Sequence, residues 1–183
     1  ERPLPRTIAV LPFEDQTGRP EAASIVRTAF INQLSGTRYD VLKTELVDAR
    51  LASRGQQVLA DAFRLSPKEA GEITGADGIV YGEVLQYQRI YLLIYSRVTV
   101  RARIRLMSAV TGESIWEADD ASRRHGAGLA INPWGLPMAA AATALNLRDA
   151  ELLYATDDLM RRMVQTIPAP ATIAAHRLPR IIG

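Results

Sequence analysis

One segment of the chain, residues 97–106, alternates strictly between polar and apolar side chains. Successive side chains of a β-strand point to opposite faces, so this period of two predicts a strand with one face in the core. The other face would meet solvent or a partner. The polar face would carry Arg97, Arg101, Arg103 and Arg105, and the apolar face would carry Val98, Val100, Ile104 and Leu106.

The arginine-bearing face extends backwards to Tyr91 and Tyr95 if residues 91–107 form one strand without a bulge. Arginine binds carboxylates and phosphates with a planar fork, and tyrosine supplies a flat stacking surface. These residues therefore predict a subunit interface or a site for an anion such as an acidic polysaccharide. A solvated, ion-paired face is the simpler alternative, and all three interpretations remain open.

The turn at residues 111–112 predicts a hairpin into a strand over residues 114–122. We expect Gly112 to take the left-handed position of a three-residue loop. Sliding the register by one residue would set apolar side chains against charged ones, so one register is favoured. It leaves Arg97 and Arg101 without an acidic partner. The expected pairs are Ala109 with Glu113, Leu106 with Trp116, Arg105 with Glu117, Ile104 with Ala118, and Arg103 with Asp119.

The first half of the chain alternates between strand and helix patterns, which favours parallel pairing through right-handed crossovers. The later strands have short connections and should form an antiparallel meander. We expect an α/β (α+β) fold: a mixed five-stranded sheet, parallel in its N-terminal β-α-β part and antiparallel in its C-terminal meander, with helices packed on it. Residues 1–167 would form one domain, and residues 168–183 a Pro-containing basic tail. Predicted strands cover residues 7–13, 39–42, 77–88, 91–107 and 114–122, and a polar loop covers 14–18. Three helices are expected in the first half of the chain, and they end at Gly36, Gly55 and near Gly75. Thr44 and Ser66 would cap the second and the third of these helices.

An insertion at residues 126–147 contains no charged side chain. Its length would suffice for a membrane-spanning helix, but two prolines and three glycines in its first half argue against one. A surface loop leading into a packed Ala-rich helix, which continues to Thr166, is one interpretation. The other is an exposed apolar contact site made by Ile131, Trp134, Leu136 and Met138.

Residue counts exclude several kinds of chemistry. The 183-residue chain has no cysteine and only two histidines, and it lacks the spacings of zinc sites, phosphate-binding loops, nucleophile elbows and dinucleotide fingerprints. Its net charge of +2 gives little support to nucleic-acid binding. We expect no catalysis, metal or cofactor, since an enzyme would need a pocket converging on Glu14, Asp15 or His125, and we expect His125 to lie in a loop.

Three segments carry a family resemblance: IAVLPF at residues 8–13 with Thr17-Gly18 after it, GADGIVYG at 75–82, and AVTGESIW at 109–116. In this order and spacing they resemble bacterial envelope lipoproteins with the fold of the TolB amino-terminal domain. That group includes the curli secretion channel, the Pel polysaccharide export and the penicillin-binding-protein activator lipoproteins. The resemblance covers about residues 6–165. It is closest to a neisserial surface-antigen lipoprotein family, which is similar in having a Gly- and Ala-rich insertion after the Trp-containing strand.

The resemblance implies a non-catalytic periplasmic protein, anchored to the outer membrane by a lipid, that forms a homo-oligomer or binds an envelope protein. Its role would be assembly or scaffolding in envelope export or biogenesis. The chain begins Glu1-Arg2-Pro3 without a methionine, so the lipid-bearing cysteine is expected upstream of Glu1. The alternative is a monomeric adaptor that regulates a cell-wall enzyme or binds an anionic glycan. The transmembrane hairpins of the curli channel have no clear counterpart in this sequence.

Overall fold

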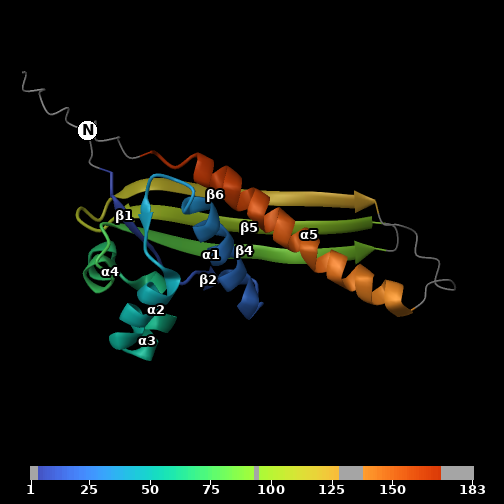
Figure 1. Cartoon of the computed structure of the whole chain (residues 1–183), viewed down its shortest axis with the longest axis horizontal. Coiled ribbons are helices and arrows are strands. Elements are labelled where there is room, and N and C mark those ends of the chain that lie inside the picture. The colour runs from blue at the N-terminus through green and yellow to red at the C-terminus, as the bar shows by residue number, and fades with distance from the viewer. Residues whose placement is uncertain (1–3, 93–94, 128–137, 170–183) are drawn as a thin grey trace, which may run out of the picture.

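A computed structural model describes residues 4–92, 95–127 and 138–169, and in them the chain forms one mixed sheet with helices packed on it (Figure 1). The strand order is β3-β1-β4-β5-β6, with a short strand β2 beside β4. The elements are β1 (Thr7–Val10), β2 (Glu14–Asp15), α1 (Pro20–Leu34), β3 (Asp40–Val41), α2 (Thr44–Ser53), α3 (Gln56–Ala60), the 3₁₀ helix η1 (Ala62–Arg64), α4 (Pro67–Thr74), β4 (Gly78–Leu92), β5 (Tyr95–Ser108), β6 (Ser114–Ala127) and α5 (Met138–Gln165).

The N-terminal part of the sheet is parallel, as predicted: β1 lies between β3 and β4 and runs parallel to both. The predicted strand count is wrong, because Glu14 and Asp15, expected in a loop, form β2 parallel to β4. The backbone N–H of Gln16 extends this pairing by donating to the carbonyl of Val84 at 3.0 Å. Two polar residues give no periodic signal, so sequence patterning could not distinguish this strand from a loop.

Strands β4, β5 and β6 form the predicted antiparallel meander, but they are longer than expected. Residues 91–107 are not one strand, because β4 continues to Leu92 and β5 begins at Tyr95. Residues 89–97 contain no Gly, Pro, Asn or Asp to mark a turn, which explains the misplaced boundary. Strand β6 continues to Ala127, so His125 lies in a strand and not in a loop.

The hairpin between β5 and β6 confirms most of the predicted register. Gly112 has a φ of +74°, in the left-handed region. The pairing of Ala109 with Glu113 is wrong, because the N–H of Ser108 donates to the carbonyl of Glu113 and the loop is therefore one residue longer. A register shift after Leu106 compensates for the extra residue. The pairs Leu106 with Trp116, Arg105 with Glu117, Ile104 with Ala118 and Arg103 with Asp119 are confirmed.

Helix starts are partly as predicted. The Ser66 hydroxyl accepts the N–H of Glu69 at 3.3 Å and caps α4, which ends at Gly75. Thr44 is not a cap, because it is the first residue of α2 and Lys43 precedes it with an extended backbone and no side-chain cap.

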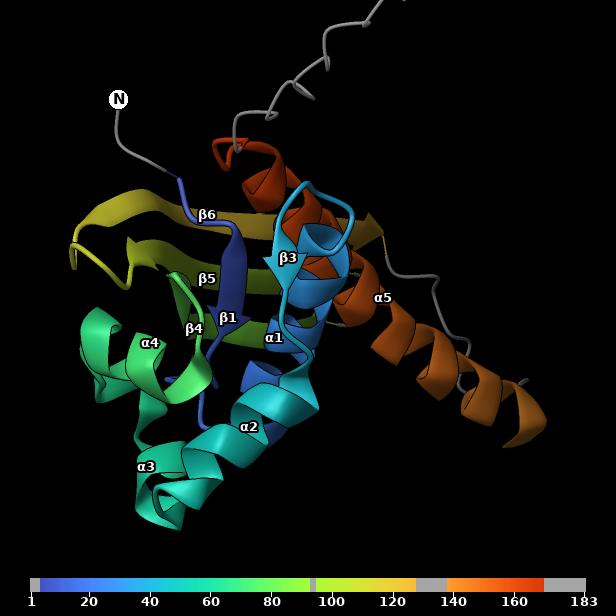
Figure 2. The ribbon, with the colours of Figure 1, turned by 60° about the vertical axis from the view of Figure 1, so that its left-hand side comes forward.

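The two faces of the sheet are covered differently. Helices α1 and α5 pack on one face, over a core that includes Phe30, Val100, Ile104 and Leu159. Helices α2 and α4 pack on the opposite face, but only over β1, the start of β4 and the end of β5 (Figures 1 and 2). Beyond that point no described helix covers this second face, and the long strands project from the body of the molecule.

Candidate functional site

The arginines of β5 lie on the second face of the sheet, beyond the part that α2 and α4 cover. We call this uncovered part the helix-free face. Val98, Val100 and Ile104 are at most 1% exposed, whereas the side chains of Arg101, Arg103 and Arg105 are 38–43% exposed on the opposite side. The alternation predicted for these positions is therefore confirmed. We call the surface formed by Arg101, Arg103, Arg105, Glu83 and Asp119 the arginine face.

Arg101 has an acidic partner, contrary to the prediction. Its Nε donates to Asp119 Oδ1 at 2.9 Å and its Nη2 donates to Asp119 Oδ2 at 3.0 Å. Directly opposite Arg101 is Ala121, and Asp119 lies two residues away along β6. A long side chain reaches this diagonal neighbour, which the prediction from directly facing pairs did not consider.

Glu83 on β4 is the member of the arginine face that the sequence prediction missed. Its carboxylate lies 3.5 Å from Arg103 Nη1 and 3.7 Å from Arg105 Nη2. Arg105 faces Glu117 in the register as predicted, but its ion pair is with Glu83 on the other neighbouring strand. Only a correct boundary between β4 and β5 would have placed Glu83 opposite Arg103.

The arginine face is a continuous row of alternating charges. Arg103 bridges the two carboxylates, because its Nη2 also donates to Asp119 Oδ2 at 3.0 Å. Three arginines against two carboxylates leave an excess of one positive charge. Half-exposed ion pairs of this kind contribute little to the free energy of unfolding, because solvent screens them. Because every arginine already binds a carboxylate, the arrangement favours contact with a charged protein surface over binding of a free anion.

The pKa of the Asp119 carboxyl is a measure of the ion pairs in this row. The hydrogen bond from Arg101 holds the pKa of Asp119 below its ordinary value of 3.8, and Arg103 adds to the effect. We expect an NMR titration to place its midpoint below 3.8, and Arg101→Gln to raise it. Because the folded pKa is lowered, the stabilisation is present above pH 3.8 and is lost as the pH falls through the folded pKa. Arg161→Gln on α5 is the control, and an Asp119 midpoint that Arg101→Gln leaves unchanged contradicts the prediction.

The other predicted members of this surface are placed only in part. Arg97 lies on β5, opposite Ile90 of β4 and His125 of β6, and Tyr95 of β5 lies opposite Leu92 of β4. Tyr91 is on β4 opposite Ser96, so it does not belong to the arginine-bearing strand. The side chains of Arg97, Tyr91 and Tyr95 lie outside the described residues, and their role stays a prediction.

The two ends of the uncharged insertion lie within the described residues. Gly126 and Ala127 complete β6, and Met138 begins α5. The contact residues Ile131, Trp134 and Leu136, and the side chain of Met138, lie outside the described residues. No helix in the described part of the chain is long and apolar enough to cross a membrane.

The carboxylates and the histidine considered for catalysis do not converge. The Asp15 carboxylate accepts the N–H and the hydroxyl of Thr17, and so supports its own turn. Glu14 pairs with Glu83, which faces position 103 of β5, whereas His125 faces position 97. Six residues along a strand correspond to about 20 Å. Within residues 4–92, 95–127 and 138–169, no group of three acidic or histidine side chains could hold a metal ion.

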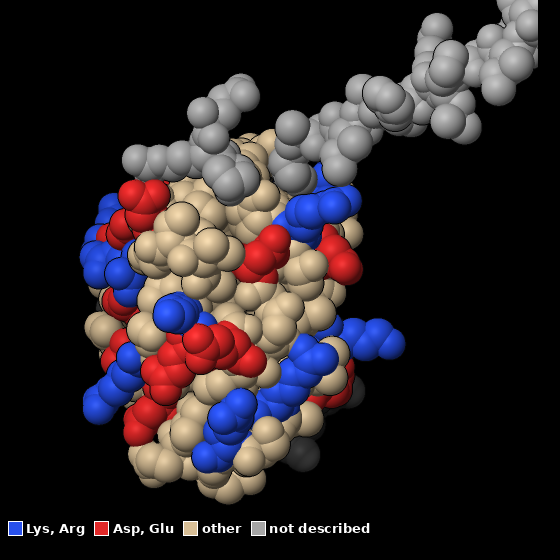
Figure 3. Space-filling model, turned by 90° about the vertical axis from the view of Figure 1, so that its left-hand side faces the viewer, with Lys and Arg blue, Asp and Glu red and all other residues tan. Residues whose placement is uncertain are grey.

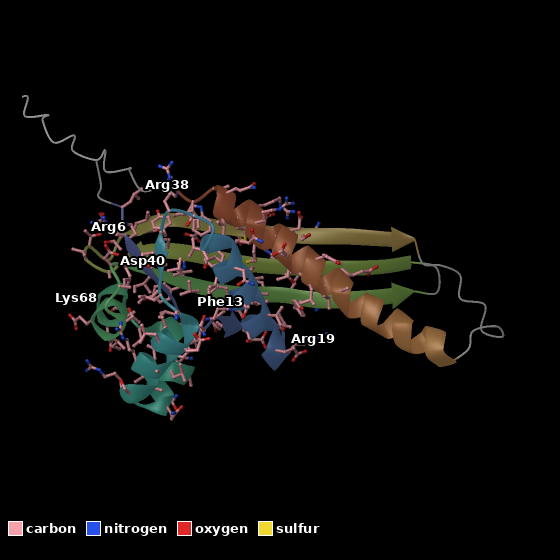
Figure 4. The ribbon with its side chains drawn as sticks, viewed as in Figure 1. Arg6, Phe13, Arg19, Arg38, Asp40 and Lys68 are labelled. Carbon is pink, nitrogen blue, oxygen red and sulfur yellow. The ribbon has the colours of Figure 1, made fainter. Side chains whose placement is uncertain are left out.

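Both ends of the described chain lie at the same end of the sheet. The Asp77 carboxylate accepts the backbone N–H groups of Arg6 and Thr7 at 2.8–3.1 Å, and the Tyr39 hydroxyl donates to the carbonyl of Pro168 at 2.6 Å. Figure 4 shows Arg6 and Arg38 at this end, and acidic and basic side chains are interspersed over it in Figure 3. The far ends of β4 and β5 lie at the opposite end (Figure 1).

The fold and its exposed charged face define a mixed α+β domain whose candidate site is a surface and not a pocket. Residues 2–146 match the family described as "Putative lipoprotein GNA1162-like", and the chain belongs to this family. A curated relative, "Putative lipoprotein NMB1124/NMB1162" of Neisseria meningitidis serogroup B, is 27% identical over 122 residues, which are 67% of this chain. The match spans only 56% of that relative's length.

Solved structures of two other proteins illustrate the shared fold. The crystal structure of lipoprotein GNA1162 from Neisseria meningitidis superposes with a TM-score of 0.62 at 22% identity, covering 79% of this chain and 99% of the other. A PelC dodecamer from Paraburkholderia phytofirmans gives a TM-score of 0.53 at 14% identity, covering 92% and 94%. The predicted resemblance and fold class are therefore confirmed, and the chain is a member of a lipoprotein family of the bacterial envelope.

Proposed function

We propose that this chain is a non-catalytic periplasmic domain, held at the outer membrane by a lipid anchor upstream of Glu1, that self-assembles as a component of envelope export or biogenesis. The observation that carries this proposal is the arginine face, a row of half-exposed ion pairs on the side of the meander that the described helices leave uncovered. Membership of a lipoprotein family supports the envelope location.

The chemistry of the arginine face suits a protein partner. Each guanidinium has five N–H donors and each carboxylate has about four acceptor positions, so Arg101, Arg103 and Glu83 have bonding capacity beyond their mutual contacts. A second protein surface with interspersed charges could use this capacity without leaving a charge buried and unpaired. Complementary charges of this kind determine which partner binds and in which orientation.

The position of the termini supports the same function. An anchor that precedes Glu1 would hold the end of the sheet where Asp77 binds the entering chain, and β4–β6 would extend away from it. The fold is compatible with a closed assembly, because the PelC structure that shares it is a dodecamer.

Reversing two charges should break the contact through the arginine face. We expect the wild-type protein to have a mass above the 20.1 kDa of one chain, and the double variant Arg101→Glu, Arg103→Glu to have a clearly lower mass. The new carboxylates would repel Glu83 and Asp119 at the centre of the row. Light scattering over a range of protein concentrations measures the mass, and circular dichroism checks that the variant is folded.

Arg161→Glu is the matched control, because Arg161 is also an exposed arginine with an ion pair, to Asp158 on α5, and should leave the mass unchanged. A wild-type mass of 20.1 kDa at every concentration would overturn self-assembly and favour the monomeric adaptor. A double variant that keeps the full wild-type mass would show that the arginine face is not a contact of the assembly.

A further inference from the structure

Strand β6 is an open edge of the sheet. It is 14 residues long, and within the described residues no strand pairs with its outer side. The N–H of Ala121 donates to the Asp120 side chain at 2.7 Å, so this N–H points away from β5. Because the direction alternates along a strand, the odd-numbered residues from 117 to 123 present their backbone groups at the open edge.

Two exposed charged side chains on this strand, Glu117 and Arg123, make no side-chain hydrogen bond or ion pair within the described part of the chain. Their charged neighbours differ in this respect, because Asp119 binds Arg101 and Arg103, and Asp120 binds Arg162 of α5. Glu117 and Arg123 lie on the helix-free face of the sheet, at equal distances in sequence before and after Asp120.

We propose that β6 pairs with β6 of a second copy of this chain, antiparallel about a two-fold axis at Asp120. Glu117 of each copy then lies opposite Arg123 of the other, and both charges gain a partner. This inference rests on the self-assembly proposed above and names a contact, separate from the arginine face, by which two copies join. The N-terminal ends of the two chains then lie at opposite ends of the joined sheet. A second copy of this chain is the partner because β6 carries an acidic residue before a basic one. The same strand in the opposite direction therefore presents the complementary charges.

Backbone geometry agrees with this register. It sets residue 117 opposite 123 and residue 119 opposite 121, so residues whose N–H and carbonyl groups face outward meet each other. The N–H of Ala121 would exchange its bond with Asp120 for the partner's carbonyl at position 119. The proposed register also sets Asp120 opposite Asp120 at the axis, where each carboxylate already binds Arg162 of its own chain. Displacing the register by two residues one way sets Asp119 against Asp119 and leaves both Glu117 and Arg123 without a charged partner. Displacing it the other way sets Arg123 against an Asp119 that already binds two arginines.

Charge reversal tests the pairing in the full chain. We expect Glu117→Arg and Arg123→Glu each to weaken dimerisation by about tenfold or more, because each change turns two attractive cross-strand pairs into repulsive ones. The double variant Glu117→Arg, Arg123→Glu should recover the wild-type dissociation constant. An equimolar mixture of the two single variants should also form dimers, since positions 117 and 123 are then both basic in one chain and both acidic in the other. Sedimentation equilibrium measures each constant, and Lys68→Glu on α4 is the charge-reversal control.

A cysteine at the axis supplies a second readout, since the chain has none of its own. Residues directly opposite on paired strands have Cβ atoms about 4.5–5.5 Å apart, near the reach of a disulfide. Asp120→Cys should therefore form a disulfide-linked dimer on mild oxidation, and Thr111→Cys in the hairpin turn should not.

The outcomes separate this inference from the proposed function. An oligomer that needs Arg101 and Arg103 but ignores the charges at 117 and 123 overturns the β6 pairing alone. Single variants that weaken the dimer without rescue by the double variant or by the mixture also overturn it. A wild-type protein that is monomeric at every concentration overturns both, and the exposed charges of β6 then protect its edge from pairing.

Discussion

Replacing Phe30 by alanine is expected to lower the free energy of unfolding by about 3–5 kcal/mol. Phe30 is completely buried in α1. Its ring centroid lies 6.2 Å from that of Phe13, after β1, and 6.4 Å from that of Trp116 on β6. The ring therefore joins the parallel part of the sheet to the last strand of the meander, and its removal leaves a cavity between them.

Guanidinium unfolding followed by circular dichroism measures this loss. Phe63→Ala is the control, because the Phe63 ring is only half-buried and packs beneath the Arg64 guanidinium at 5.3 Å. That change should cost clearly less. A loss below about 1 kcal/mol for Phe30→Ala, well under what such a truncation usually costs, would contradict the prediction and show that the surrounding side chains collapse into the space.

Replacing Asp48 by alanine is expected to cost about 3 kcal/mol, since it leaves a buried guanidinium without its ion partner. Arg27 of α1 is 8% exposed, and its Nη1 and Nη2 donate to the Asp48 carboxylate of α2 at 2.9 and 2.7 Å. Nη2 also donates to the carbonyl of Val10 at 2.8 Å. This cluster links α1, α2 and the end of β1.

The double variant Arg27→Met, Asp48→Leu is the informative comparison. It removes both charges and keeps apolar volume, so it should lose much less stability than Asp48→Ala alone. Denaturant unfolding of the single and double variants gives the comparison. Equal losses in both would mean that the pair acts through packing and not through its charge.

Local chemistry made several features predictable from the sequence. The period of two in residues 97–106 determined which side chains enter the core, and apolar pairing determined the register of Ile104 with Ala118. Ser66 and Gly75 marked the ends of α4. Residues 8–13, 75–82 and 109–116 carried enough of the family's pattern to indicate both fold and family.

Features that depend on spatial neighbours could not be predicted in the same way. The pairing of Arg101 with Asp119 requires a diagonal contact between strands, and that of Arg105 with Glu83 requires the boundary of β4. The predicted boundary between the domain and the C-terminal tail at residue 167, and the contact roles of Ile131, Trp134 and Leu136, stay predictions.

The one-sided covering of the meander has a consequence for the thermodynamics of binding. Because α1 and α5 hold Val98, Val100 and Ile104 in the core, the backbone that carries Arg101 and Arg103 is ordered before any partner arrives. The ion pairs with Asp119 and Glu83 also restrict the rotamers of these arginines. Association through this face should therefore lose little conformational entropy. The favourable free energy of the interactions between complementary charges is then offset less by the cost of ordering side chains.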